Sequence, residues 1–184
     1  MTRAAASFAR PGYPHLANLP AMQRSMPDTD LVLAELVQLP IGEVLGREHL
    51  ARMARVGTIE RFAAAACLFR EGEAAADLRF VVSGRISLTL EIPGQAPMVV
   101  ASLSRGDLLG WSVLQGWQSP STWSASATAS KPSVCLRFAG ADIRELCELD
   151  HELGFYMMRH AFAVVSRRLR DCRVQLLDVF GAGG

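Results

Sequence analysis

The chain has 184 residues, of which half are hydrophobic and a fifth are charged, and its formal net charge is +1. This balance is typical of a globular protein and excludes a strongly basic nucleic-acid binder or a cationic membrane-surface protein. No run of about 18 apolar residues occurs, so we predict no membrane-spanning segment. The length suits one domain of roughly 100 to 150 residues with additional tails.

Residues 1–34 are expected to form a flexible arm. The stretch from Met1 to Met26 contains three arginines, several alanines and serines, and no acidic residue, which is the composition of an organelle-targeting peptide. Its prolines interrupt any amphipathic helix and favour an unstructured arm. An arm that docks on a partner is the third alternative. Residues 29–56 then predict short helices broken at Pro40 and Gly42.

Glycines punctuate short β-type segments from Phe62 onward. They recur at roughly ten-residue intervals, as expected for the corners of an all-β barrel or roll, at positions 72, 84, 94, 106 and 110. Between Ile86 and Ile92 apolar and polar residues alternate, and "PGQAP" supplies a turn before "MVVASL". We therefore predict a hairpin with one buried face, and a further strand at Ser133–Phe138.

A long helical region is expected after Gly140, with Asp142 as the N-cap and a second helix start at "DHEL", Asp150–Leu153. Apolar residues then follow at alternating steps of three and four. We expect its first two turns to lie on the β domain and the remainder to meet a second copy of the chain. The predicted dimerisation seam comprises Phe155, Met158, Phe162, Val165, Leu169, Cys172 and Leu176. The arginines at 167, 168, 170 and 173 are expected on a solvated face rather than on nucleic acid.

The remaining reactive residue types are scattered. Four cysteines lack metal-ligand spacing, and free thiols suit a reducing cytoplasm. The four histidines stand apart from any nucleophile or metal-ligand cluster, and His151 and His160 are expected at the surface. We therefore assign no catalytic residue and no metal, and we expect a non-enzymatic, cytoplasmic protein.

Three segments carry a resemblance to a known family: "FREGE" (Phe69–Glu73), "LRFVVSGRISLTL" (Leu78–Leu90) and "LSRGDLLGWSVL" (Leu103–Leu114), followed by the long helix. Together they resemble the cyclic-nucleotide-binding domain of bacterial catabolite-activator-type regulators. The resemblance implies a mainly β fold with flanking helices. The expected domain, residues 35–184, is a jelly-roll-like β-roll, or double-stranded β-helix, followed by a long C-terminal helix.

In that family a strand, short helix and strand form a cassette in which backbone N–H groups and an arginine hold the cyclic phosphate, while a glutamate binds the ribose. The resemblance places Trp111 at the glutamate position and Trp123 at the arginine position. Tryptophan has one N–H donor and no charge, so it cannot replace either group. The expected ligand-binding positions are Gly106, Asp107, Gly110, Trp111, Ser112, Val113, Leu114, Thr122, Trp123, Ser124 and Ala125.

Two interpretations of the tryptophan pair remain open. The indoles either line a remodelled pocket for a flatter, more apolar ligand or fill the vacated cavity. The leading hypothesis is a regulatory module that binds a small ligand and signals through its C-terminal helix to another protein. The alternatives are a scaffold protein with a dead pocket, and a genuine cyclic AMP or cyclic GMP receptor that uses another charge such as Arg105. No cofactor is required, and a cyclic nucleotide or another small molecule is the candidate ligand. Family members that read DNA carry a further module after the long helix, and the sequence ends at "VFGAGG", so direct DNA binding is not expected.

Overall fold

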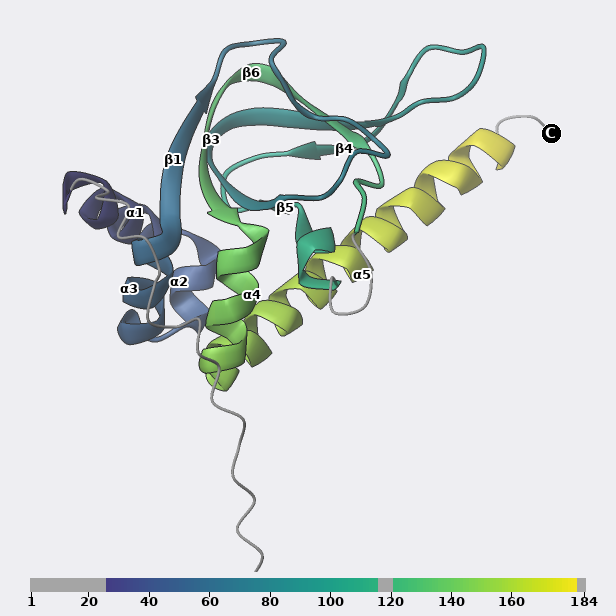
Figure 1. Cartoon of the computed structure of the whole chain (residues 1–184). Coiled ribbons are helices and arrows are strands. Elements are labelled where there is room, and N and C mark those ends of the chain that lie inside the picture. The colour runs from purple at the N-terminus through teal and green to yellow at the C-terminus, as the bar shows by residue number, and fades with distance from the viewer. Residues whose placement is uncertain (1–25, 116–120, 182–184) are drawn as a thin grey trace, which may run out of the picture.

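The computed structural model describes residues 26–115 and 121–181, with side chains at 28–115, 121–171 and 173. Three helices precede the β-roll and pack at one end of it: α1 (Met26–Gln38), α2 (Pro40–Val44) and α3 (Arg47–Val56) (Figure 1). Val32 and Leu36 of α1 are fully buried. The predicted boundary at residue 34 therefore falls inside α1, and residues 26–34 belong to a packed helix. Residues 1–25 of the predicted arm lie outside the described part.

The breaks between these helices follow proline and glycine chemistry. Pro40 begins α2, where its missing N–H leaves no intrahelical hydrogen bond unmade, so the predicted break at Pro40 is confirmed. Gly42 lies within α2 instead of interrupting it, and its N–H donates to the Leu39 carbonyl at 2.8 Å. The second break falls at Gly46, the extended residue before α3.

All strand pairs of the β-roll in the described part of the chain are antiparallel. The main path through the sheet is β1–β6–β3–β4, with β2 paired to β6 and β5 paired to β3, and the sheet does not close on itself. The strand bounds are β1 Gly57–Phe62, β2 Cys67–Phe69, β3 Asp77–Leu90, β4 Met98–Leu103, β5 Leu108–Leu109 and β6 Ser126–Ala139. The predicted hairpin is confirmed as β3 paired with β4, and the predicted strand Ser133–Phe138 is the second half of a longer β6.

The long strands β3 and β6 change register together near Gly84. This residue has φ +87°, and a Cβ at its position would lie 2.2 Å from the Pro132 carbonyl oxygen. Only glycine allows both the left-handed backbone and this close approach. Gly84 therefore marks a corner of the roll, as the sequence predicts.

Strands and helices share one hydrophobic core. Phe80 of β3 and Phe138 of β6 meet edge to face at 6.0 Å, and the buried cluster continues into α1, α3 and the C-terminal helices. Close-packed interiors respond to volume changes by discrete shifts. A change inside the roll can therefore reach the helices through direct packing.

Two helices follow the roll, α4 (Gly140–Leu149) and α5 (His151–Gly181). The N-cap of α4 is Ala139, so Asp142 lies in the first turn and its prediction as the N-cap is wrong. The predicted helix start at "DHEL" is confirmed, because α5 begins at His151 directly after Asp150. In the described part of the chain, no helix is both long enough and apolar enough to cross a membrane.

Asp150, between α4 and α5, forms hydrogen bonds to the N-terminal helix α3. Its Oδ1 accepts the Leu153 N–H at 3.1 Å, while its Oδ2 accepts His49 Nδ1 at 2.6 Å and Arg52 Nη1 at 2.7 Å. Burial opposes ionisation of Asp150, but the Leu153 amide, His49 and Arg52 outweigh it and lower the pKa of this carboxyl. The start of α5 is thus fixed, and any adjustment of this helix is left to its later turns.

Candidate functional site

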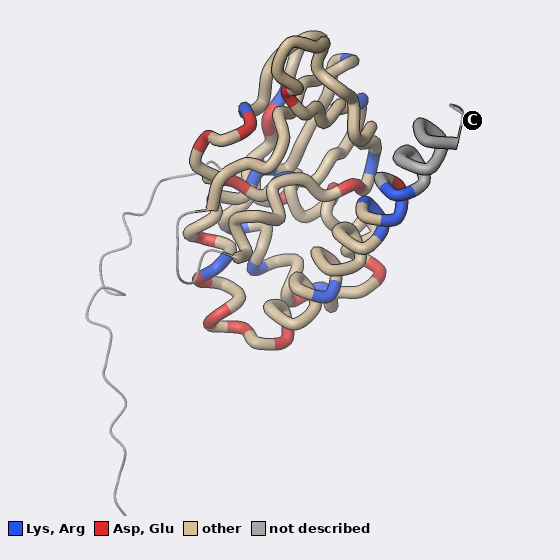
Figure 2. The backbone as a smooth tube through the Cα atoms, turned by 90° about the vertical axis from the view of Figure 1, so that its right-hand side faces the viewer, with Lys and Arg blue, Asp and Glu red and all other residues tan. Residues whose placement is uncertain are grey.

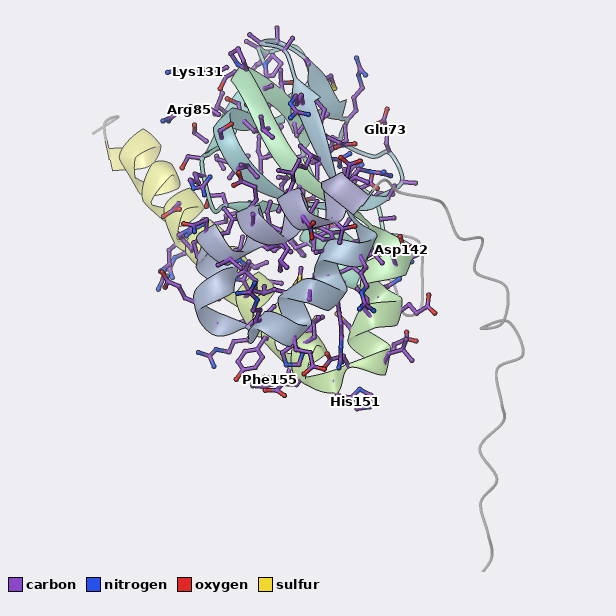
Figure 3. All side chains as sticks on the ribbon, turned by 90° about the vertical axis from the view of Figure 1, so that its left-hand side faces the viewer. Glu73, Arg85, Lys131, Asp142, His151 and Phe155 are labelled. Atoms are coloured by element: carbon purple, nitrogen blue, oxygen red, sulfur yellow. The ribbon has the colours of Figure 1, made fainter. Side chains whose placement is uncertain are left out.

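Helix α5 crosses the open side of the β-roll (Figure 1). Its apolar side chains form two stripes, one buried and one exposed. The inward stripe is fully or almost fully buried and comprises Leu153, Met157, Ala161 and Val164. The predicted seam faces away from the core, with relative exposures between 52% and 74% at Phe155, Met158, Phe162 and Leu169. The first two turns of α5 do pack on the core, but they do so through Leu153 and Met157 and not through the seam residues. Figure 3 shows Phe155 and His151 at the end of the molecule away from the roll.

Two glycines with positive φ flank β5 in the segment predicted as the cassette. Gly106 has φ +87° and Gly110 has φ +80°, and a Cβ on Gly110 would lie 2.2 Å from the Asp77 carbonyl oxygen. Asp107 closes the turn by accepting the Ser104 N–H at 2.9 Å, and it pairs with Arg167 of α5 at 2.6 Å. Glycine and aspartate at these positions therefore shape the turn and leave Asp107 engaged by the chain itself.

The short helix η2 (Trp111–Gln115) follows this turn. Ser112, Val113 and Leu114 are all buried within it. Thr122 is exposed and forms an isolated β-bridge to Ala74. Of the predicted site positions, the structure brings Gly110, Trp111, Ser112, Trp123, Ser124 and Ala125 together around one hollow.

Trp123 fills this cassette hollow. It is 5% exposed and stacks on Phe69 with ring centroids 4.1 Å apart and planes 20° apart. Its backbone is fixed on both sides, because Gly72 N–H donates to its carbonyl and its own N–H donates to Glu73, each at 2.9 Å. The remaining cavity measures about 30 Å³, close to the volume of one water molecule. The indole thus fills most of this hollow.

Trp111 borders a second, larger cavity. Its half-buried ring lines a cavity of about 250 Å³ that lies between the cassette, the β3–β4 hairpin and α5. The other apolar walls of this cavity come from Leu88, Leu90, Val100, Ala125, Val165 and Leu169. The two tryptophans therefore separate: Trp123 packs the cassette, and Trp111 forms one wall of a neighbouring cavity.

Arg168 of α5 borders this cavity, although it was not among the predicted ligand-binding positions. It lies one turn beyond Val164 and continues the inward stripe, which corrects its predicted place on a solvated face. Its Nη2 donates to the Leu108 carbonyl, and its buried Nε has no hydrogen-bond partner among the described residues. Burial lowers the pKa of Arg168, Asp107 opposes that shift, and the guanidinium remains charged at neutral pH. The helical spacing of the inward stripe could have identified Arg168. The stripe runs from Leu153 to Val164, and Arg168 is the next position on the same face.

A wider polar cleft of about 540 Å³ opens on the other side of Arg168. It lies between the β4–β5 loop and α5, and its charged lining comprises Arg105, Asp107, Arg167, Arg168 and Asp171. Figure 2 shows the basic positions of α5 beside the roll in this region. Arg105 donates to the Val82 carbonyl at 2.8 Å and pairs with Glu35 at 3.4 Å, so its guanidinium is engaged within the chain.

His160 is half-buried, so its predicted surface position is wrong, whereas His151 is exposed as predicted. The His160 ring lies against Phe80 with centroids 6.0 Å apart, and its Nε2 is buried without a hydrogen-bond partner in the described part. Burial lowers the pKa of His160, so the neutral imidazole is favoured in the folded protein.

The described residues show little catalytic chemistry. No group of three or more His, Cys, Asp or Glu side chains among them could hold a metal ion. Burial raises the pKa of Cys135 to about 12 and that of Cys147 to about 11. Thiols with such values are poor nucleophiles at neutral pH because the thiolate is the reactive form.

Comparison with known proteins agrees with this geometry. Residues 59–150, half of the chain, match the family model of the cyclic nucleotide-binding domain. No curated protein matches the chain. A candidate cyclic nucleotide-binding protein from Geobacter metallireducens is similar in structure, with 26% identity, a TM-score of 0.63, and coverage of 74% of this chain and 96% of that one.

Two further solved structures share the fold at lower identity. A cyclic nucleotide-binding domain from Methylobacillus flagellatus has 16% identity and a TM-score of 0.67, with 82% of this chain and 83% of that one covered. The regulatory domain of PKA from Toxoplasma gondii, solved with cAMP, has 18% identity and a TM-score of 0.59, with coverage of 72% and 49%. The predicted fold class, a mainly β fold with flanking helices in which a β-roll precedes a long helix, is confirmed. The chain belongs to the cyclic nucleotide-binding domain family.

Proposed function

We propose that the chain is a cytoplasmic, non-enzymatic regulatory module that binds a small ligand between its roll and α5 and signals occupancy to another protein through that helix. One of the solved structures that share its fold is a regulatory domain, that of Toxoplasma gondii PKA. The observation that carries the proposal is the 250 Å³ cavity, whose walls come from the roll on one side and from Val165, Arg168 and Leu169 of α5 on the other. The free thiols of Cys67, Cys135 and Cys147 suit a reducing compartment.

A ligand in this cavity would bind with an affinity that depends on where α5 lies. By linkage, the ligand then shifts the helix toward the position that binds it best. Arg168 bonds to Leu108 and Arg167 pairs with Asp107, and these polar contacts hold this part of α5 on the roll. The Arg167 pair is largely exposed, and such pairs stabilise by at most about 1 kcal/mol. The Arg167 pair therefore opposes movement of the later turns only weakly.

The test is thermal unfolding of the full chain with a panel of uncharged, flat apolar compounds beside cyclic AMP and cyclic GMP. Hydrogen exchange is followed along α5 in the same samples. A compound with a Kd of about 10 µM, present at 1 mM, should stabilise the fold by roughly 2.7 kcal/mol. We expect at least one panel compound to raise Tm and change exchange near residues 165–169, and the Trp111→Ala variant to lose this response. Neither cyclic nucleotide should do so, because Trp123 fills the cassette.

A panel that leaves Tm and α5 exchange unchanged would contradict the proposal and favour the scaffold alternative. That alternative rests on the Trp123–Phe69 stack, which closes the cassette. A Tm increase with cyclic AMP or cyclic GMP alone would instead favour a genuine nucleotide receptor. Arg105 would have to leave Glu35 and Val82 to supply the charge for such a receptor.

We also propose that the outward stripe of α5 pairs with a second copy of the chain. Phe155, Met158, Phe162 and Leu169 are exposed at steps of three, four and seven residues, which keep them on one face as in a helix–helix seam. Val165, which is half-buried, and Leu169 also line the cavity, so the two surfaces meet at these residues. The predicted seam residues Cys172 and Leu176 have side chains outside the described part.

Phe162→Glu is expected to convert a micromolar dimer into a monomer, because it places a charge at the most exposed apolar position of the stripe. Ala163→Glu is the matched control, since Ala163 is exposed on a different face of the same turn. Sedimentation velocity measures both variants and the unmodified chain. An unmodified chain that sediments as a monomer at about 100 µM would contradict the dimer.

A further inference from the structure

We propose that the ligand of the 250 Å³ cavity is a small organic monoanion, an apolar body that carries one carboxylate, and that Arg168 is the group that pairs with it. The inference rests on the proposed function and names the class of ligand for the same cavity. It moves charge recognition from the cassette of the roll to the C-terminal helix.

The position of Arg168 is the first step. Its side chain borders the apolar cavity, the small cassette hollow and the polar cleft, so it lies where the three spaces meet. A ligand with its apolar part beside Trp111 can therefore bring an acidic group to the guanidinium.

The unmatched charge is the second step. A guanidinium has five N–H donors, and the structure places one donor group of Arg168 on the Leu108 carbonyl. The buried Nε has no partner, and Arg168 forms no ion pair within the described residues, whereas the neighbouring Arg167 is paired with Asp107. A partly buried cation without a counter-ion is costly, and a carboxylate in a bidentate arrangement would relieve that cost.

The size and lining of the cavity define the rest of the ligand. A volume of about 250 Å³ lies below the range of roughly 300–1,000 Å³ that holds drug-sized molecules, so the body is a small ring system or a short chain. Trp111 offers a flat face, and Leu88, Leu90 and Val165 supply aliphatic contacts. These walls favour an apolar body that can stack.

The surrounding acids limit the ligand to a single charge. Asp107 and Asp171 line the polar cleft beyond Arg168, and Asp107 is already matched by Arg167. A second negative charge on the ligand would lie close to these carboxylates, and the other arginines that line the cleft, Arg105 and Arg167, already pair with acids of the chain. A monocarboxylate therefore fits this site better than a phosphate dianion.

The test compares 2-naphthoate with its neutral isostere 2-naphthamide on the full-length chain by isothermal titration calorimetry. We expect the carboxylate to bind at least tenfold more tightly than the amide, a difference of about 1.4 kcal/mol. In Arg168→Gln the two affinities should become equal within about twofold. Arg170→Gln, an exposed arginine on the same helix, is the matched control and should keep the full preference.

Each result has one meaning. Equal binding of the two probes to the unmodified chain overturns the anion inference and leaves the proposed function intact, because the cavity still binds. A carboxylate preference that survives in Arg168→Gln overturns the assignment to Arg168. Absence of binding by either probe at millimolar concentration overturns the inference, while the proposed function is decided separately by the uncharged panel and α5 exchange. If Arg168→Gln does not fold, Arg168→Lys replaces it and should reduce the preference, because lysine cannot pair bidentately.

Discussion

Replacing Trp123 with alanine is expected to lower the free energy of unfolding by roughly 3 to 5 kcal/mol, the range for truncating a buried tryptophan. The ring is 5% exposed and stacks on Phe69 at 4.1 Å. Little relaxation can fill the space, because the backbone on both sides is hydrogen-bonded to Gly72 and Glu73. Urea unfolding of the variant beside the unmodified chain measures the loss.

The same variant tests whether Trp123 fills the cassette. The truncation should leave an indole-shaped cavity next to the existing 30 Å³ hollow. Added indole should then raise the Tm of Trp123→Ala more than that of the unmodified chain, since a ligand that binds only the folded state stabilises it. Trp111→Ala is the matched control, because its half-buried ring borders the open cavity and its loss should be smaller. A loss under 1 kcal/mol for Trp123→Ala, with no rescue by indole, would show that the cassette is not packed by this ring.

Replacing Arg79 with methionine is expected to cost about 3 kcal/mol, because breaking a buried ion pair leaves an uncompensated charge. Arg79 lies on β3 and is 6% exposed. Its Nε bonds to Glu60 of β1 at 2.8 Å and its Nη2 to Asp77 at 3.2 Å. Arg137 of β6 also pairs with both acids, which places the expected loss at the low end of the usual 3–5 kcal/mol range.

Arg61→Met is the control for this network. Arg61 lies on the same strand as Glu60 and is exposed, so its replacement should change stability by no more than about 0.5 kcal/mol. The double variant Arg79→Met with Glu60→Gln should lose less than the sum of the two single variants, because the two groups share one interaction. Denaturant unfolding gives all four values. Additive losses would show that Arg79 and Glu60 are not coupled.

Local patterns predicted a large part of the β-roll. The alternation from Ile86 to Ile92 and the turn after it fold as the β3–β4 hairpin, because strand pairing there links neighbours in sequence. Gly106 and Gly110 adopt the positive φ that a sharp turn requires, a property that glycine brings to any context. The start of α5 was also predictable from local sequence, because the Asp150 carboxylate accepts a hydrogen bond from the N–H of Leu153, three residues further along the chain.

The site depended on contacts that no local pattern contains. Helix α5 carries two apolar stripes at helical spacing, and periodicity alone cannot tell which stripe the roll will bury. The fold buries the stripe that contains Leu153 and Val164. This orientation of α5 places Arg168 beside the cavity and leaves Phe162 exposed.

The two tryptophans show the same division. Their residue type by itself determined that neither position carries a charge, because an indole has one N–H donor and no ionisable group. The tertiary structure decided that Trp123 fills the cassette hollow and that Trp111 lines a cavity. Phe69 of β2 stacks on Trp123, whereas α5 leaves a gap beside Trp111. The physical reason is that chemical identity belongs to each residue, whereas burial and cavity volume arise from elements that are distant in the chain and pack together only in the folded state.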